Sequence, residues 1–140
     1  MTVFDDIHES EITQSDDLFI VIRDRFPVSN GHSLIIARRL DAVTFFDLTE
    51  AEQQKMVRLI QRVKLELDAL YSPDGYNIGM NCGISAGQTI MRFHCHVIPR
   101  YRGDMEDPRG GVRHCIPGHG NYLAGSRSID CLNTHIRQGQ

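Results

Sequence analysis

Apolar residues follow a helical period in one stretch of the chain, between residues 50 and 71. They recur at steps of three and four, which places them on one helix face: Met56, Leu59, Ile60, Val63, Leu67 and Leu70. Thr49 is a suitable N-cap, and Glu50 and Glu52 fall in the first turn, where acidic side chains are favoured. The run Ser72-Pro-Asp-Gly75 ends the pattern. The sequence therefore predicts one long amphipathic helix.

Short segments rich in β-formers lie on both sides of this helix. Two precede it and two follow it: 18–22, 32–37, 76–81 and 91–98. Pro27 and Asn30-Gly31 mark a turn between the first two segments, and Pro99 is expected to close the last one. The order strand, strand, helix, strand, strand predicts an α+β fold in which the helix covers an antiparallel sheet.

The regular pattern dissolves after Tyr101. Residues 101–121 are rich in glycine and proline among charged side chains, so they are expected to form an irregular loop region. Residues 122–140 carry few apolar groups and are expected to form a loosely packed tail. We therefore expect one domain over residues 1–121, which includes the loop region, followed by the tail.

The composition narrows the classes of function. A chain of 140 residues with 41% hydrophobic and 24% charged residues is typical of a soluble globular protein. A net charge of -3 disfavours a general binder of nucleic acid or of membrane surfaces. No apolar run reaches the roughly 18 residues that span a bilayer, and the N-terminus lacks the features of a signal peptide. Four cysteines without a C-x-x-C pair favour reduced thiols and hence a cytoplasmic protein.

The strongest chemical feature is the segment from Arg92 to Arg100. Because side chains alternate between the faces of a strand, Arg92, His94 and His96 are expected to share one face. The opposite face is apolar and belongs to the core: Phe93, Cys95 and Val97. Three polar groups in succession on one face are unusual for a plain solvent-exposed surface, so this face is a candidate site.

Three interpretations of the two histidines compete on the residues alone. They are exposed side chains without a special role, or they chelate a metal, or they act in nucleophilic catalysis, where one imidazole attacks and the other assists. A zinc site requires three or four protein ligands, and further ligands would have to come from Cys82, His32 or His114. The residues by themselves leave these alternatives open.

A glycine-bearing loop, residues 81–89, precedes the histidine strand. Glycines allow the backbone to approach a phosphate closely, and Asn81 and Thr89 offer an amide and a hydroxyl as hydrogen-bonding groups. The loop lacks the lysine and the spacing of a P-loop. Taken alone it is better explained as a hairpin turn, but its place just before the histidines favours phosphate binding.

Together these segments resemble the histidine triad (HIT) family over roughly residues 10–121. The matching segments occur in the family's order: Arg23-Asp-Arg-Phe-Pro-Val28, Gly31-His32, Phe45-Phe-Asp-Leu48, Asn77-Ile-Gly-Met-Asn81, Gly87-Gln-Thr89, Phe93-His-Cys-His-Val-Ile-Pro-Arg100 and Asp107-Pro-Arg-Gly-Gly-Val-Arg113. The resemblance implies a HIT-like α+β fold with an antiparallel sheet of about five strands and one long helix. It also implies a homodimer whose sheets join edge to edge.

The activity that the resemblance implies is hydrolysis or transfer at the α-phosphate of a purine nucleotide. The substrate classes are nucleoside phosphoramidates and dinucleoside polyphosphates, and the reaction passes through a nucleotidyl-histidine intermediate. No cofactor or resident metal is required, although Mg²⁺ is possible with polyphosphate substrates. Arg92 stands where the family has its first histidine, which leaves a catalytically weakened nucleotide-binding or sensing module as the alternative. A metal-dependent hydrolase built on His94 and His96 is a third hypothesis.

The same resemblance assigns roles to individual positions. It makes His94 the nucleophile, whose ring is oriented in part by the main-chain carbonyl of residue 92. His96 and Thr89 are expected to stabilise charge and the leaving group. The residues expected to bind the nucleotide are Asp24 at the ribose hydroxyls, His32 and Asn81 near the phosphate, Gln88, for which a role in the turn is favoured, and Arg92. We expect Arg92 to contact substrate phosphate, unless it points to solvent or pairs with a carboxylate such as Glu106 or Asp107.

Overall fold

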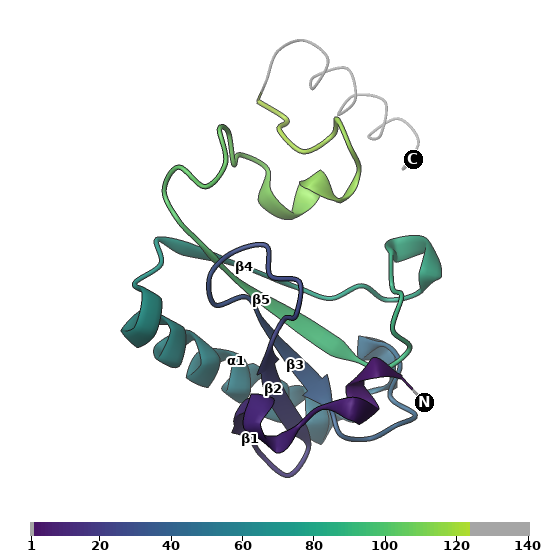
Figure 1. Cartoon of the computed structure of the whole chain (residues 1–140). Helices are drawn as coiled ribbons and strands as arrows, with labels where there is room; N and C mark the ends of the chain where they lie inside the picture. Colours follow the sequence, from purple (N-terminus) through teal and green to yellow (C-terminus); the bar gives the residue numbers. More distant parts are fainter. Residues whose placement is uncertain (1, 124–140) are drawn as a thin grey trace. The chain divides into compact units, whose positions relative to one another are not determined.

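The computed structural model describes residues 2–123 and divides the chain into two compact units, 1–101 and 102–140. The first unit contains a five-stranded antiparallel sheet and one long helix, as Figure 1 shows. Its elements are β1 (Ile12–Ser15), β2 (Phe19–Arg23), β3 (Ser33–Ala37), α1 (Glu50–Tyr71), β4 (Gly75–Gly79) and β5 (His94–Arg100). The predicted α+β fold with about five strands is confirmed.

The last strand in the sequence lies inside the sheet. The strand order is β1-β2-β3-β5-β4, so β5 is inserted between β3 and β4. In the register of β3 with β5, Leu34 lies opposite His96 and Ile36 lies opposite His94. The histidine strand is therefore held on both sides.

The helix begins and ends as its sequence predicts. Thr49 Oγ1 accepts a hydrogen bond from the Glu52 N–H at 3.1 Å, and Glu52 Oε1 accepts one from the Thr49 N–H at 2.9 Å. This capping box satisfies backbone donors that the first turn leaves without partners. Ser72, with φ 48°, ends the helix in the left-handed region. Leu70 was expected on the apolar face but is 61% exposed, which is a correction.

The two faces of the sheet are covered differently. One face packs against α1, and its buried residues include Cys95 and Val97 from β5 and Phe93 just before it. The other face has a smaller apolar cluster formed by Ile20, Ile22, Leu34 and Ile36, and Phe4 from the N-terminal segment completes it. His94 and His96 alternate with the residues that face α1, so they project on the side of this smaller cluster.

Two strand assignments from the sequence are wrong. The four-residue strand β1 was not predicted, and it pairs with β2 through an irregular register. Strand β5 begins at His94 rather than at residue 91, and it continues through Pro99 to Arg100. Proline fits there because β3 pairing stops at Ser33 opposite Val97. The Pro99 carbonyl instead accepts a hydrogen bond from Ser29 Oγ at 2.6 Å.

The described part of the second unit, residues 102–123, consists of turns and the short 3-10 helix Gly111–Cys115. Its internal contacts centre on Asp107, which pairs with Arg109 at 3.0 Å and accepts a hydrogen bond from Asn121 at 2.6 Å. This agrees with the irregular structure expected there, whereas the predicted tail falls almost wholly outside the described residues. The three described cysteines are free. Within residues 2–123, no helix combines the length and apolarity needed to cross a membrane.

Candidate active site

A cavity of about 360 Å³ lies on the histidine side of the sheet. It is lined by the N-terminal segment, the end of β2 and the turn after it, the start of β3, the loop before β5, and β5 itself. Six of the eight predicted site residues line it: Asp24, His32, Asn81, Thr89, His94 and His96. Gln88 and Arg92 do not. The structure therefore brings most of the predicted residues to one place, from four separate stretches of sequence.

His94 has a fixed tautomer. Its Nδ1 lies 2.9 Å from the main-chain carbonyl oxygen of Arg92. Because a carbonyl only accepts hydrogen bonds, Nδ1 carries the proton and the lone pair is on Nε2. The ring also contacts the edge of Phe4, with centroids 5.1 Å apart and planes at 75°. An oriented imidazole with an unprotonated Nε2 beside a cavity is suited to nucleophilic attack.

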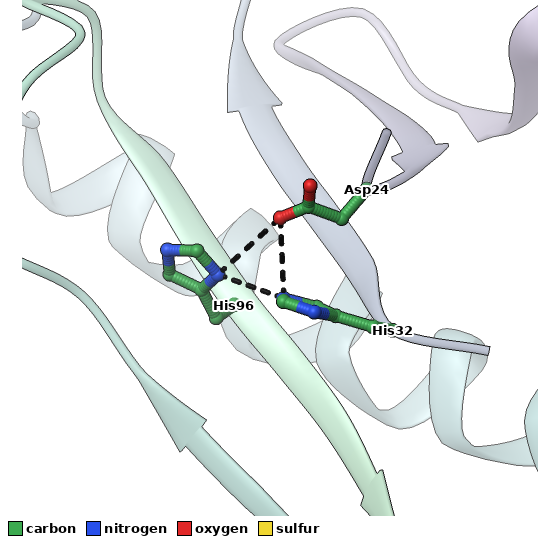
Figure 2. A group of neighbouring side chains, drawn as sticks. All are labelled: Asp24, His32 and His96. Atoms are coloured by element: carbon green, nitrogen blue, oxygen red, sulfur yellow. Dashed lines mark hydrogen bonds and ion pairs between the residues drawn. The ribbon is translucent and has the colours of Figure 1, made fainter. Parts of the chain in front are cut away.

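His32 and His96 form a chain of hydrogen bonds that ends at the cavity. The Val28 N–H donates to His32 Nδ1 at 3.1 Å, so the proton of neutral His32 is on Nε2. That Nε2 lies 2.9 Å from His96 Nδ1 and 3.4 Å from the Asp24 carboxylate, as Figure 2 shows. His96 Nδ1 is therefore the acceptor, and the His96 proton resides on Nε2. The Val28 backbone N–H thus fixes the tautomer of His32, and His32 in turn leaves His96 with a donor N–H at Nε2.

His32 and His96, the two histidines joined by these hydrogen bonds, are neutral at pH 7. Burial lowers the pKa of His96 to about 4, His94 and His32 add to the effect, and the Asp24 carboxylate opposes it. Burial likewise lowers the pKa of His32 against the opposing charge of Asp24. The 3.4 Å contact between His32 Nε2 and the Asp24 carboxylate consequently involves a neutral ring and is not an ion pair.

The same three side chains have the spacing of a metal site. Ligand atoms of Asp24, His32 and His96 all lie within 4.8 Å of one another. However, a metal on His32 Nε2 would place the proton on Nδ1, where the Val28 N–H already donates. The donor set therefore fits a hydrogen-bonded cluster better than a metal centre. Of the further ligands considered from the sequence, His32 lies in this cluster, and Cys82 and His114 do not.

The loop before β5 presents two polar groups and is shaped by a third. Asn81 and Thr89 are exposed and line the cavity. Gln88 is buried, and its Oε1 accepts from the Gly83 N–H at 2.9 Å while its Nε2 donates to the Val43 carbonyl at 2.7 Å. Both ends of its amide are hydrogen-bonded to the backbone, which favours the role in the turn over a nucleotide contact. The loop reverses direction at Gly87, whose φ of 91° is readily adopted by glycine.

Arg92 lies away from where the sequence analysis expected it. Its guanidinium is buried, and Nη1 donates to Asp5 Oδ1 at 3.0 Å. Arg92 pairs with a carboxylate, but that carboxylate is Asp5, from the N-terminal segment, and not Glu106 or Asp107. A hydrogen bond from the Thr2 backbone, together with the nearby Arg92 charge, lowers the pKa of Asp5. Contact with substrate phosphate is therefore not the function that this geometry favours for Arg92.

The N-terminal segment is the part of the site that sequence reasoning missed. Val3 and Phe4 line the cavity, and they belong to the 3-10 turn Val3–Asp6. Thr2 Oγ1 accepts from the Phe4 N–H at 3.3 Å, and Asp5 Oδ2 accepts from the Thr2 N–H at 2.5 Å. The spacing Thr2-x-x-Asp5 is a capping-box signal, and it was present in the sequence.

The buried histidines predict a specific pH dependence of stability. Their pKa values are lower in the folded chain than in the unfolded one, so the unfolded state binds more protons below about pH 6.5. The free energy of unfolding should therefore fall as the pH drops from about 6.5 towards about 4. For His96 alone the loss is on the order of 3 kcal/mol. Urea denaturation across this range measures it.

The matched variant for this measurement is His96→Gln, which removes the histidine whose pKa folding lowers more. Its free energy of unfolding should change less with pH over the same window. Carboxylates with lowered pKa values lose their contribution as the pH falls through their unfolded pKa values of 3.8 to 4.5, so the part of the window above about pH 5 reports on the histidines. An unfolding free energy that is flat between about pH 7 and about pH 4.5 in the unsubstituted protein would contradict the assignment.

Comparison with known proteins identifies the family. The HIT domain family model matches residues 7–103. An uncharacterized HIT-like protein of Mycoplasma genitalium is 34% identical over 103 residues, which are 71% of this chain and 72% of that protein. A bis(5'-adenosyl)-triphosphatase of Saccharomyces cerevisiae is 33% identical over 76 residues, which are 54% of this chain and 37% of the enzyme. This chain therefore matches well under half of the yeast enzyme's length.

Solved structures agree with this result. A zinc-bound histidine triad family protein from Mycobacterium smegmatis superposes with a TM-score of 0.62 at 32% identity, over 69% of each chain. Relatives in the family include nucleotide hydrolases, as the yeast enzyme illustrates. With the sheet order, the paired histidines on the interior strand β5 and the family match in agreement, this chain belongs to the HIT family.

Proposed function

We propose that this protein is a nucleotide hydrolase or transferase that acts at an α-phosphate through a covalent intermediate on His94. The observation that carries the proposal is the hydrogen bond from His94 Nδ1–H to the Arg92 carbonyl, which leaves Nε2 free beside the cavity. The His96 ring lies 5.3 Å from the His94 ring and brings an N–H donor to the same place. A nucleophile next to a donor for developing negative charge is what phosphoryl chemistry requires.

The proposed reaction has two steps. The Nε2 lone pair attacks the α-phosphorus, the bond from phosphorus to the leaving group breaks, and a nucleotidyl-His94 adduct forms. The ring then carries a positive charge, and its Nδ1–H stays hydrogen-bonded to the Arg92 carbonyl, which stabilises that charge. Water next attacks phosphorus, the P–N bond breaks, a proton is released, and neutral His94 is restored with a nucleoside monophosphate as product. His96 Nε2–H donates to the phosphoryl oxygens in both steps.

The proposed substrates are purine nucleoside phosphoramidates and dinucleoside polyphosphates. The relative that is a bis(5'-adenosyl)-triphosphatase supports the second class. We propose that no resident metal is needed, because His32 donates rather than ligates, and that Mg²⁺ assists only with polyphosphates. Arg92 motivated the alternative of a weakened binding module, but residue 92 still supplies the carbonyl that orients His94.

A turnover screen with adduct trapping tests the proposal. The protein is incubated with an AMP-linked amine or a dinucleoside polyphosphate, labelled at the α-phosphate, and is quenched in alkali, where phosphohistidine bonds survive. We expect turnover in chelator for the phosphoramidate, and label on the peptide that contains His94. Binding without turnover would instead support the sensing module. Loss of phosphoramidate turnover in chelator, with stoichiometric metal in the protein, would support a metal-dependent hydrolase.

Asp24 is proposed to accept hydrogen bonds from the ribose hydroxyls. Its side chain is 15% exposed and lines the cavity, but its Oδ1 already accepts from the Phe26 N–H at 2.8 Å and its Oδ2 faces His32. Asp24→Asn keeps the shape and removes the charge. We expect it to weaken binding of ribonucleotides about tenfold more than that of 2′-deoxyribonucleotides, measured by calorimetry. Equal weakening for both sugars would place the role of Asp24 in the histidine chain alone.

The homodimer and the cytoplasmic location implied by the sequence remain predictions. Size-exclusion chromatography with light scattering measures the first directly.

A further inference from the structure

An ion pair between the buried Arg92 and the more exposed Asp5 joins the two ends of the first unit next to the candidate nucleophile. Arg92 is 6% exposed, and its Nη1 donates to Asp5 Oδ1 at 3.0 Å, across 87 residues of sequence. Its Nε has no hydrogen-bond partner among the described residues. A buried guanidinium with an unpaired N–H is expensive in stability. Stability alone therefore does not account for an arginine at this position.

The same ion pair holds an aromatic ring against His94. The guanidinium carbon of Arg92 lies 5.9 Å from the centre of the Phe4 ring, and that ring contacts the His94 imidazole edge to face. Phe4 is 6% exposed and directly precedes Asp5 in the 3-10 turn. Asp5 therefore fixes the turn that carries Phe4, and Arg92 fixes Asp5.

Arg92 thus supports His94 by two separate routes. Its carbonyl accepts the Nδ1–H of His94, and its side chain anchors the segment that packs on the same ring. The carbonyl route is available to any residue at position 92, whereas the side-chain route requires a cation there and a carboxylate at position 5. The imidazole is consequently held by a hydrogen bond at Nδ1 and by apolar contact from Phe4.

We propose that Arg92 and Asp5 are positioning residues that hold Phe4 against His94 and so orient the nucleophile. The inference rests on the proposed function of His94, but it concerns a contact that can be measured without substrate. A small displacement of a reacting group lowers the rate of the chemical step more than it weakens substrate binding. The pair should therefore affect kcat rather than KM.

The test compares Asp5→Asn with Asp6→Asn. The first substitution removes the charge that faces Arg92, and the second makes the same change at the next residue, for which no ion pair exists among the described residues. We expect Asp5→Asn to lower kcat by about 10- to 100-fold with KM within about threefold, and Asp6→Asn to match the unsubstituted protein. Arg92→Met should resemble Asp5→Asn, and the double variant should be no slower than either single one.

Proton NMR of the His94 ring separates this proposal from the proposed function. Phe4 shifts the His94 ring resonances through its ring current, and Phe4→Leu defines the resonance positions without that contact. Asp5→Asn should move the resonances towards those of Phe4→Leu, and Asp6→Asn should not. Unmoved resonances and an unchanged kcat in a folded Asp5→Asn variant would overturn the positioning role. If no substrate is turned over by the unsubstituted protein, the enzymatic proposal fails, while the resonances still decide whether the ion pair holds Phe4 on His94.

Discussion

Replacement of His94 by alanine is expected to reduce kcat at least about 10³-fold, because it removes the group proposed to form the covalent bond to phosphorus. Nucleotide affinity should stay within about tenfold, because the other polar groups of the cavity remain. Folding should be preserved, since the His94 side chain lines the cavity and the neighbouring core residues Phe93 and Cys95 are unchanged. Steady-state kinetics and equilibrium binding of the same nucleotide measure both effects.

The control for this variant is His8→Ala, which removes an exposed imidazole of the first unit that does not line the cavity. It should leave kcat unchanged and still yield the nucleotidyl adduct. Turnover by folded His94→Ala within about tenfold of the unsubstituted protein would remove the covalent mechanism. Loss of turnover together with loss of nucleotide binding would instead mean that His94 acts in binding.

His96→Ala is expected to lower kcat by about 10²- to 10³-fold, because it deletes the N–H donor for the phosphoryl oxygens. The fold should tolerate this change. His32 Nε2–H keeps an acceptor in the Asp24 carboxylate, at 3.4 Å, so no buried donor is stranded. The nucleotidyl adduct should still form on His94, but slowly, and rapid-quench kinetics measure the rate of its appearance.

Because His32 sets the tautomer of His96, the variant His32→Phe can be compared with His96→Ala. His32→Phe leaves His96 in place but removes the proton donor at its Nδ1, so the His96 proton is no longer confined to Nε2. We expect this variant to show part of the kcat loss of His96→Ala. A folded His96→Ala variant with unchanged kcat would show that the proposed donor plays no part in the chemical step.

Local patterns predicted the helix and the main strands because each has enough residues for its period to be visible. The segment β1 was missed since four residues provide too short an alternation, and its pairing with β2 is irregular. The end of β5 was misplaced at Pro99 because proline is tolerated where the neighbouring strand has already ended. That information is tertiary and is not present in the local sequence.

For the candidate site as well, local patterns predicted the residues, and tertiary contacts could not be predicted. The sequence predicted functional roles for His94 and His96, and the family resemblance added Asp24. The structure brings all three side chains to one cavity. Arg92 was misread because strand alternation indicates the face that a side chain occupies but not the partner that meets it there. Its partner, Asp5, lies in a segment whose capping spacing was visible, but nothing in the spacing tells where that turn packs.

The insertion of β5 between β3 and β4 sets an order for the formation of the site during translation. When β3 and β4 have left the ribosome, neither yet has β5 beside it, and β3 exposes an open edge of backbone donors and acceptors next to apolar side chains. This edge is covered only when residues 94–100 emerge, so a stalled or truncated chain that ends before them is an aggregation hazard. Synthesis of the strand that carries His94 and His96 therefore completes the sheet and the candidate active site in a single event.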